Sequence, residues 1–320
     1  MSILASAVLA SLLRMQESGL PQPVQTIPMP KVEGRIDHLS FDANAGRLWV
    51  AALGNNTVEV IDLGQGKVIH RIVGLHEPQG ILSLDGRIVV ASGGDGSCRF
   101  YDGAAFMQVQ KVDCKEDADN VRYDAEAKQV YVGYGNGALA VIDPEKGARI
   151  GDIPLEAHPE SFQIEAKGKR IFVNVPKAGH IAVVDREKRA VIAKWKLSAA
   201  DNYPMALDEA GRRLFVGCRQ PSKLLIFDID SGKERAAVEC SGDTDDVFYD
   251  ASSKRLFLSC GAGFLDVFDA SDAAPKRVGK VATTAGARTC LYVAEQGKIF
   301  LAVPHRGTQQ AEIRVYSTRP

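Results

Sequence analysis

The chain has 320 residues, of which 45% are hydrophobic and 25% are charged, so it is long enough and apolar enough to bury a large core. Its 39 lysine and arginine residues nearly balance its 40 aspartate and glutamate residues, and the formal net charge is -1. This balance argues against a nonspecific nucleic-acid binder and leaves only a local basic patch open to that function.

Residues 1–22 differ from the rest of the chain in composition. The run SILASAVLASLL at 2–13 is apolar and ends before Arg14; it is too short to span a bilayer but has the length of the hydrophobic region of a signal peptide. The absence of lysine or arginine ahead of it counts against a signal. We expect 1–22 to be either an export signal or a disordered tail, and we favour the signal, which predicts a periplasmic or secreted protein.

The stretch 47–73 contains the pattern around which the chain is organised. It holds three short apolar runs rich in β-branched and aromatic residues, and the first two are separated by Gly54, Asn55 and Asn56, which favour a hairpin turn. A fourth run, 36–41, precedes the stretch and is joined to it by a turn. One unit is therefore expected to be a four-stranded antiparallel meander.

The unit recurs through the chain, most plainly in its second strand. The copies of that strand are RLWV at Arg47, RIVV at Arg87, QVYV at Gln129, RIFV at Arg170, RLFV at Arg213, RLFL at Arg255 and KIFL at Lys298. The third strand recurs too, and six of its seven copies end in aspartate, at Asp62, Asp102, Asp143, Asp185, Asp228 and Asp269. A spacing of roughly 40 to 47 residues is typical of the blades of a β-propeller.

The two ends of the chain are expected to meet in one blade. The run VQTIPMP at 24–30 resembles the fourth strand of the other units, whereas the last unit, which ends in IRVYSTRP, has only three strands. An N-terminal strand that completes the last blade would remove an exposed sheet edge. We therefore predict an all-β fold: a monomeric, seven-bladed β-propeller of four-stranded antiparallel blades, formed as one domain by 23–320 and closed by its N-terminal strand.

The segment WVAALGNNTVEVIDLGQGKVIHRI at 49–72 resembles the repeat of the YVTN family of β-propellers, the YncE-like proteins of bacteria. Related copies cover nearly all of 24–317, and the signatures of WD40 and kelch blades are missing. The resemblance implies a seven-bladed propeller that is commonly exported and is related in fold to quinoprotein amine dehydrogenase subunits. It implies no single activity, because such propellers serve as binding scaffolds, nucleic-acid binders, lyases or lactonases.

A functional site is expected at the top face, where the inner strand of each blade begins beside the central channel and where the loop between its second and third strands opens. Polar residues gather at these inner-strand starts, among them Asp37, His38, His76, Glu77, Asp119, Asn120, His158, Glu160, Tyr203, Asp245 and Arg288.

Three interpretations of this rim stay open. In the first, aspartate and histidine cap the inner strands and recur only because the blade recurs. In the second, a divalent cation lies in the central channel, although no local motif such as HExxH supports it. Its candidate ligands are His38, Glu77, Asp119, Glu160 and Asp245. In the third, the top loops bind an anionic or polar ligand. The candidate contacts are Arg219, Arg288, His305, Arg306, Asn120 and Tyr203.

The loop 303–311, VPHRGTQQA, is the most marked departure from the repeat, because it is longer than its counterparts and carries adjacent His305 and Arg306. It is either a functional loop or a lengthened hairpin at the closure seam. The loop 175–180 is a weaker departure of the same kind.

Two functions from different classes remain. We favour an exported, non-enzymatic scaffold that binds a small molecule or a protein partner through its top face and needs no assured cofactor. The alternative is a lyase or lactonase-type enzyme with a divalent cation in the channel and His38 or His305 as general acid or base. The six cysteines form no CxxC motif, and most are expected to be buried thiols; a disulfide stays open for an exported protein, but the spacing assigns none.

Overall fold

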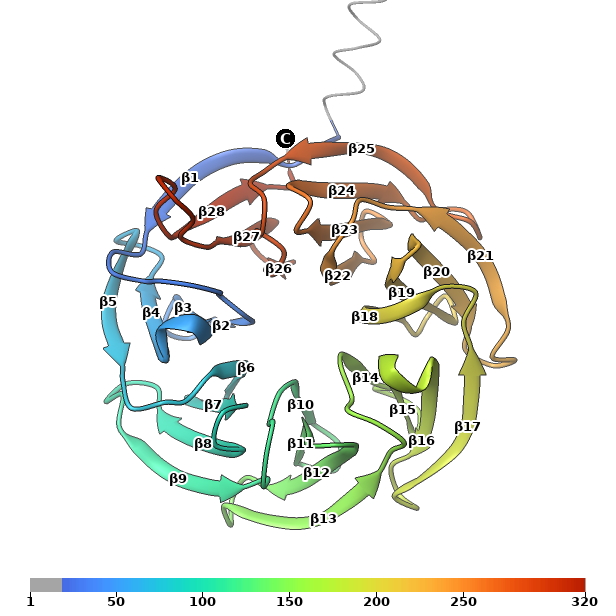
Figure 1. Ribbon diagram of the computed structural model, residues 1–320, viewed down its shortest axis with the longest axis horizontal. Helices are drawn as coiled ribbons and strands as arrows, with labels where there is room; N and C mark the ends of the chain where they lie inside the picture. Colours follow the sequence, from blue (N-terminus) through green and yellow to red (C-terminus); the bar gives the residue numbers. More distant parts are fainter. Residues whose placement is uncertain (1–18, 320) are drawn as a thin grey trace, which may run out of the picture.

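The computed structural model describes residues 19–319, which form seven four-stranded antiparallel sheets arranged in a ring (Figure 1). The predicted seven-bladed β-propeller is therefore confirmed. The predicted export segment at 2–13 lies outside the described residues. Within the part that is described, no helix has the length and apolar character needed to cross a membrane.

Each of the first six blades is a run of four consecutive strands, ordered from the channel outward (Figure 1). Blade 1 contains β2 (Leu39–Asp42), β3 (Arg47–Ala52), β4 (Thr57–Asp62) and β5 (Lys67–Ile72). Blade 2 contains β6 (Pro78–Leu84), β7 (Arg87–Ser92), β8 (Ser97–Asp102) and β9 (Gln108–Asp113). Blade 3 contains β10 (Val121–Asp124), β11 (Gln129–Tyr134), β12 (Ala138–Asp143) and β13 (Ala148–Pro154). Blade 4 contains β14 (Phe162–Ile164), β15 (Arg170–Val175), β16 (His180–Asp185) and β17 (Ala190–Lys196).

Blade 5 contains β18 (Ala200–Asp208), β19 (Arg213–Gln220), β20 (Ser222–Asp228) and β21 (Glu234–Glu239). Blade 6 contains β22 (Thr244–Asp250), β23 (Arg255–Cys260), β24 (Phe264–Asp269) and β25 (Lys276–Ala282). Blade 7 contains β26 (Cys290–Val293), β27 (Lys298–Val303), β28 (Glu312–Ser317) and β1 (Gln22–Pro28). Two short 3-10 helices, η1 (Leu53–Asn55) and η2 (Pro176–Ala178), follow the second strands of blades 1 and 4.

The middle strands of each blade carry the core. In β3, for example, every residue after Arg47 is buried, whereas outer strands such as β21 alternate between exposed and half-buried positions. Middle strands are covered on both faces by the neighbouring blades, so they read as continuous apolar runs. This explains why the second-strand motif was the clearest repeat in the sequence. All six cysteines are buried and none forms a disulfide, which confirms the expectation of buried thiols.

The repeated aspartates shape the turns that follow their strands. Asp102 accepts hydrogen bonds from the backbone N–H groups of Ala104 and Ala105 at 2.8 and 2.6 Å. Asp143 accepts them from the N–H groups of Glu145 and Lys146 at 3.0 and 3.1 Å. An aspartate that binds backbone groups two and three residues ahead stabilises a tight turn. The recurrence of these residues is thus a structural feature of the blade.

Arginines at the starts of second strands join one blade to the next. Arg47 donates a hydrogen bond to the carbonyl oxygen of Gly103 at 2.7 Å, and Arg213 donates one to that of Ala270 at 2.8 Å. Arg213 also forms an ion pair with Asp208 at 2.8 Å. Because each acceptor lies in the following blade, these contacts fix adjacent blades at the bottom of the ring.

The first and last strands of the chain pair in one sheet. β1 lies antiparallel to β28, with Gln22 opposite Ser317 and Pro28 opposite Glu312 (Figure 1). Ile27 and Met29 are fully buried in the core that blade 7 shares with blade 1. β1 therefore contributes both hydrogen bonds and apolar contacts at the seam.

We predict that loss of β1 destabilises the whole ring. A variant that begins at Val32 should unfold at a much lower temperature than one that begins at Gly19, because it loses two buried side chains that are each worth about 2–5 kcal/mol, together with a sheet edge. Thermal unfolding followed by circular dichroism makes the comparison. Equal unfolding temperatures for the two variants would show that β1 is not needed for closure.

Candidate functional site

A polar chamber of about 380 Å³ lies at the mouth of the central channel, and all seven blades contribute to its wall. Its lining comes from inner-strand starts and from loops between second and third strands, as the sequence analysis predicted for the top face. The structure brings eight of the predicted site residues together in this wall: His38, Asp119, Asn120, Glu160, Tyr203, Arg219, Asp245 and Arg288.

The chain enters several inner strands through a left-handed residue. Glu77, Asp117, Asp201 and Asp243 have φ values of 49, 45, 57 and 58° in blades 2, 3, 5 and 6. Aspartate tolerates this conformation better than most residues. The structural interpretation of the rim therefore accounts for some of its acidic residues, but not for Asp119, Glu160 and Asp245, which have no left-handed φ and line the chamber.

One side of the chamber is an arginine-rich wall in which charges are paired. Arg288 Nε lies 3.0 Å from Asp245 Oδ2, and Arg219 forms a second ion pair with the same carboxylate. Arg219 also lies over the ring of Tyr203, 3.8 Å from its centre. These two guanidinium groups, which the sequence suggested as anion-binding donors, are largely neutralised by the protein's own carboxylates.

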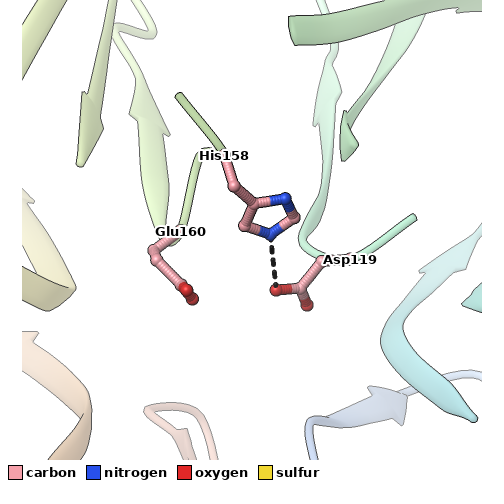
Figure 2. Close-up of side chains that lie close together, drawn as sticks. All are labelled: Asp119, His158 and Glu160. Carbon is pink, nitrogen blue, oxygen red and sulfur yellow. Dashed lines mark ion pairs between the residues drawn. The ribbon is translucent and has the colours of Figure 1, made fainter. Parts of the chain in front are cut away.

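The other side is an acidic wall formed by blades 3 and 4. Asp119, His158 and Glu160 converge there, and their nearest ligand-type atoms all lie within 4.8 Å of one another (Figure 2). His158 Nε2 is 3.7 Å from Asp119 Oδ2. Within residues 19–319, neither Asp119 nor Glu160 has a lysine or arginine at salt-bridge distance.

Backbone pairing holds the acidic wall in place. The Asp119 N–H donates to the Gly133 carbonyl at 2.8 Å, and the Glu160 N–H donates to the Asn174 carbonyl at 3.0 Å. Gly80 allows the Asp119 carbonyl to approach so closely that any side chain at position 80 would clash with it. The two carboxylates thus extend from rigid strand ends rather than from free loops.

Burial and neighbouring charges perturb two groups of the acidic wall. Burial raises the pKa of Glu160, the Asp119 carboxylate raises it further, and His158 opposes this shift. Burial alone would lower the pKa of His158, but its ion pair with Asp119 and its contact with the Gly135 carbonyl outweigh that effect and raise it. The wall therefore favours a positive charge between its carboxylates.

A second cavity, also of about 380 Å³, continues down the channel beneath the chamber. His38 lines both cavities; its ring nitrogens lie 3.7 Å from Asp37 Oδ1 and 3.6 Å from Asp246 Oδ1. Burial raises the pKa of Asp246 to about 7, although His38 and the Cys290 N–H group act in the opposite direction. Burial opposes the charged form of His38, but Asp246 and Asp37 outweigh it and raise the pKa of His38.

Three predicted site residues lie outside the chamber. The side chain of Glu77 is exposed and does not line it. His305 and Arg306 line a separate cavity of about 260 Å³ beside the seam, where His305 Nδ1 lies 2.7 Å from Glu33 Oε2. The departure from the repeat that reaches the chamber is instead η2, through Pro176 and Lys177.

His158 lies at the rim but is not among the metal ligands that the sequence predicts. A usable signal was present, because alternate residues of an extended segment point to the same side and His158 precedes Glu160 by two. No comparable signal marked Arg35 or Gln79, which also line the chamber, and Lys177 was marked only by the irregular loop 175–180. Their convergence depends on ring closure, which no local pattern specifies.

The fold and the chamber define this protein as a seven-bladed β-propeller, and comparison with solved structures supports that class. A chain of a structure titled "Crystal Structure of Mitotic Checkpoint Complex" is similar over 93% of this chain and 92% of its own length, with a TM-score of 0.79 and 12% identity. A chain of a structure titled "Kuenenia stuttgartiensis Hydrazine Synthase" is similar over 89% and 97%, with a TM-score of 0.76 and 14% identity.

These similarities establish the fold alone, because both identities are low and 1736 chains of solved structures match. No family model matches the chain, and no curated protein matches it. The YVTN assignment therefore stays a prediction.

We predict that the channel beneath the chamber makes the protein less stable as pH rises. An acid whose pKa is raised in the folded state keeps its proton there after the unfolded chain has lost it, so Asp246 lowers the free energy of unfolding between about pH 4 and pH 7. The raised pKa of His38 acts in the same direction, because its stabilising charge is lost as pH rises through that value.

The Asp246→Asn variant should flatten the dependence of the free energy of unfolding on pH, by an amount on the order of 2–4 kcal/mol across that range. An asparagine oxygen can still accept the hydrogen bond that the Cys290 N–H donates at 2.8 Å. Urea unfolding at several pH values measures the slope, and Asp272→Asn, a change at an exposed carboxylate, is the control. An unchanged slope in Asp246→Asn would contradict the assignment.

Proposed function

We propose that this protein is a binding propeller that takes up a small polar molecule through its top face and holds a cationic centre in the chamber. The observation that carries this proposal is the charge imbalance across the chamber. Asp37 and Asp245 are paired with arginines, at 2.6 Å from Arg35 and 3.0 Å from Arg288. In the described part of the chain, Asp119 and Glu160 have no such partner.

Electrostatic attraction favours a cation beside the carboxylates of Asp119 and Glu160. Two partly desolvated carboxylates that face each other repel, so a cation placed between them gains more free energy than it would in water. The volume of the chamber, about 380 Å³, falls within the range of about 300–1,000 Å³ that is usual for small-molecule sites. A small molecule is favoured over a protein partner because the polar groups that support the proposal line the chamber rather than the outer surface of the top face.

The metal-assisted enzyme of the lyase or lactonase type is a second candidate. Its support is His38, which lines both cavities and lies between two carboxylates, an arrangement suited to proton transfer. His305, the other catalytic candidate, has less support because it contacts Glu33 beside the seam. Binding is favoured because it needs only the acidic wall, where two carboxylates lack a lysine or arginine partner.

We expect small cations to raise the unfolding temperature of the protein. Putrescine, spermidine, choline and arginine should be compared with neutral and anionic compounds of similar size; a cation present at a hundred times its dissociation constant adds about 2.7 kcal/mol. The stabilisation should disappear in Glu160→Gln and persist in Glu239→Gln, which removes an exposed glutamate of β21. Stabilisation by anions only, or by none of these compounds, would contradict the proposal.

Export is also part of the proposal, and it is supported by the apolar run at 2–13 and by the resemblance to a commonly exported family. Cell fractionation should recover the full chain outside the cytoplasm and a chain that begins at Gly19 inside it. Recovery of the full chain in the cytoplasm would argue for the disordered-tail alternative.

A further inference from the structure

The acidic wall has the donor set of a metal site. It offers one imidazole nitrogen from His158 and carboxylate oxygens from Asp119 and Glu160, and the three atoms lie within 4.8 Å of one another (Figure 2). Ligands bound to one Zn²⁺ ion at about 2.0–2.1 Å in a tetrahedron are about 3.3–3.5 Å apart. The observed 3.7 Å between His158 Nε2 and Asp119 Oδ2 is close to that spacing, and the Glu160 carboxylate lies within 4.8 Å of both groups.

The orientation of His158 is an independent observation that points to a metal. Its Nδ1 lies 2.7 Å from the carbonyl oxygen of Gly135, which can only accept a hydrogen bond. In the neutral ring the proton is therefore on Nδ1, and the lone pair of Nε2 faces the carboxylates. Histidine ligands of metals commonly have their other ring nitrogen fixed in this way by a backbone carbonyl or a carboxylate.

The surroundings also supply anionic donors. Asp119 is only 7% exposed, and it shares the wall with the Glu160 carboxylate, so two oxygen ligands meet in a partly desolvated space. The neighbouring Asn120, which lines the same chamber, is 2% exposed, and its Oδ1 accepts no hydrogen bond from any described residue. A buried polar atom without a partner shows that the described residues do not satisfy every polar group beside the acidic wall.

We propose that Asp119, His158 and Glu160 hold a divalent first-row transition-metal ion, such as Zn²⁺ or Mn²⁺, with its remaining coordination positions open to the chamber. This inference rests on the proposed function, since the metal is the cationic centre that the acidic wall takes. One imidazole with two carboxylates suits these ions. Ca²⁺ requires six to eight oxygen ligands, many more than these three side chains supply.

An ion held by three protein ligands keeps at least one position for water or for an added ligand, which is the pattern of metal sites that bind exogenous molecules. The arginine-rich wall on the opposite side of the chamber, with Arg219 and Arg288 paired to Asp245, leaves the space between the walls free for that ligand.

The test uses the full chain without a histidine tag, stripped with chelator and dialysed. Isothermal titration with MnCl₂ and ZnCl₂ should give one ion per chain with a dissociation constant in the micromolar range or below. Mn²⁺ is the more informative probe because it has little affinity for the six thiols. His158→Gln and Glu160→Gln should each weaken binding at least tenfold while the circular dichroism spectrum stays unchanged.

His76→Gln is the matched control, because His76 is an exposed histidine at the corresponding entry to the inner strand of blade 2, and this variant should bind metal as tightly as the native protein. X-ray absorption of the zinc form should show imidazole scattering that disappears in His158→Gln. A stripped protein that binds neither ion, or variants that bind both unchanged, would overturn the metal site. If organic cations still stabilise the protein through Glu160, only the metal site is wrong; if they do not, the proposed function fails as well.

Discussion

The antiparallel pairing of β1 with β28 is the contact on which the ring depends. Blade 7 draws its outer strand from one end of the chain and its other three from the opposite end, with Ile27 and Met29 in the shared core. Without this pairing, blade 7 would present an open sheet edge, and the interface between blades 7 and 1 would lose buried apolar surface. Seven inner strands can meet around one channel only when the ring is closed.

The chamber is a direct consequence of that closure. Each inner strand brings a few polar residues to the axis, where side chains from blades far apart in sequence face one another in a partly desolvated space. Three arginines, Arg35, Arg219 and Arg288, form ion pairs with carboxylates there. The carboxylates of Asp119 and Glu160 have no arginine or lysine partner among the described residues. Since the blades repeat and the charges do not, this imbalance distinguishes the chamber from a uniform structural rim.

The fold and the candidate site depend on different sets of residues. Chains of the mitotic checkpoint complex and of hydrazine synthase share the propeller fold at 12% and 14% identity, so very different sequences form it. Apolar middle strands, turn aspartates and interblade contacts such as that of Arg213 hold the ring together, whereas the chamber is lined largely by residues at the inner-strand starts. Function in such a fold is therefore decided at those positions.

The sequence alone determined the blade, its sevenfold repeat and the sharing of the last sheet, because local patterns such as RLWV and the recurring aspartates encode strands and turns directly. Only the tertiary structure decided which rim residues meet. It grouped His158 with Asp119 and Glu160, paired Arg219 and Arg288 with Asp245, and separated Glu77, His305 and Arg306 from the chamber. The reason is physical: side-chain direction and charge pairing across the channel depend on the backbone conformation at each strand entry and on contacts between distant blades.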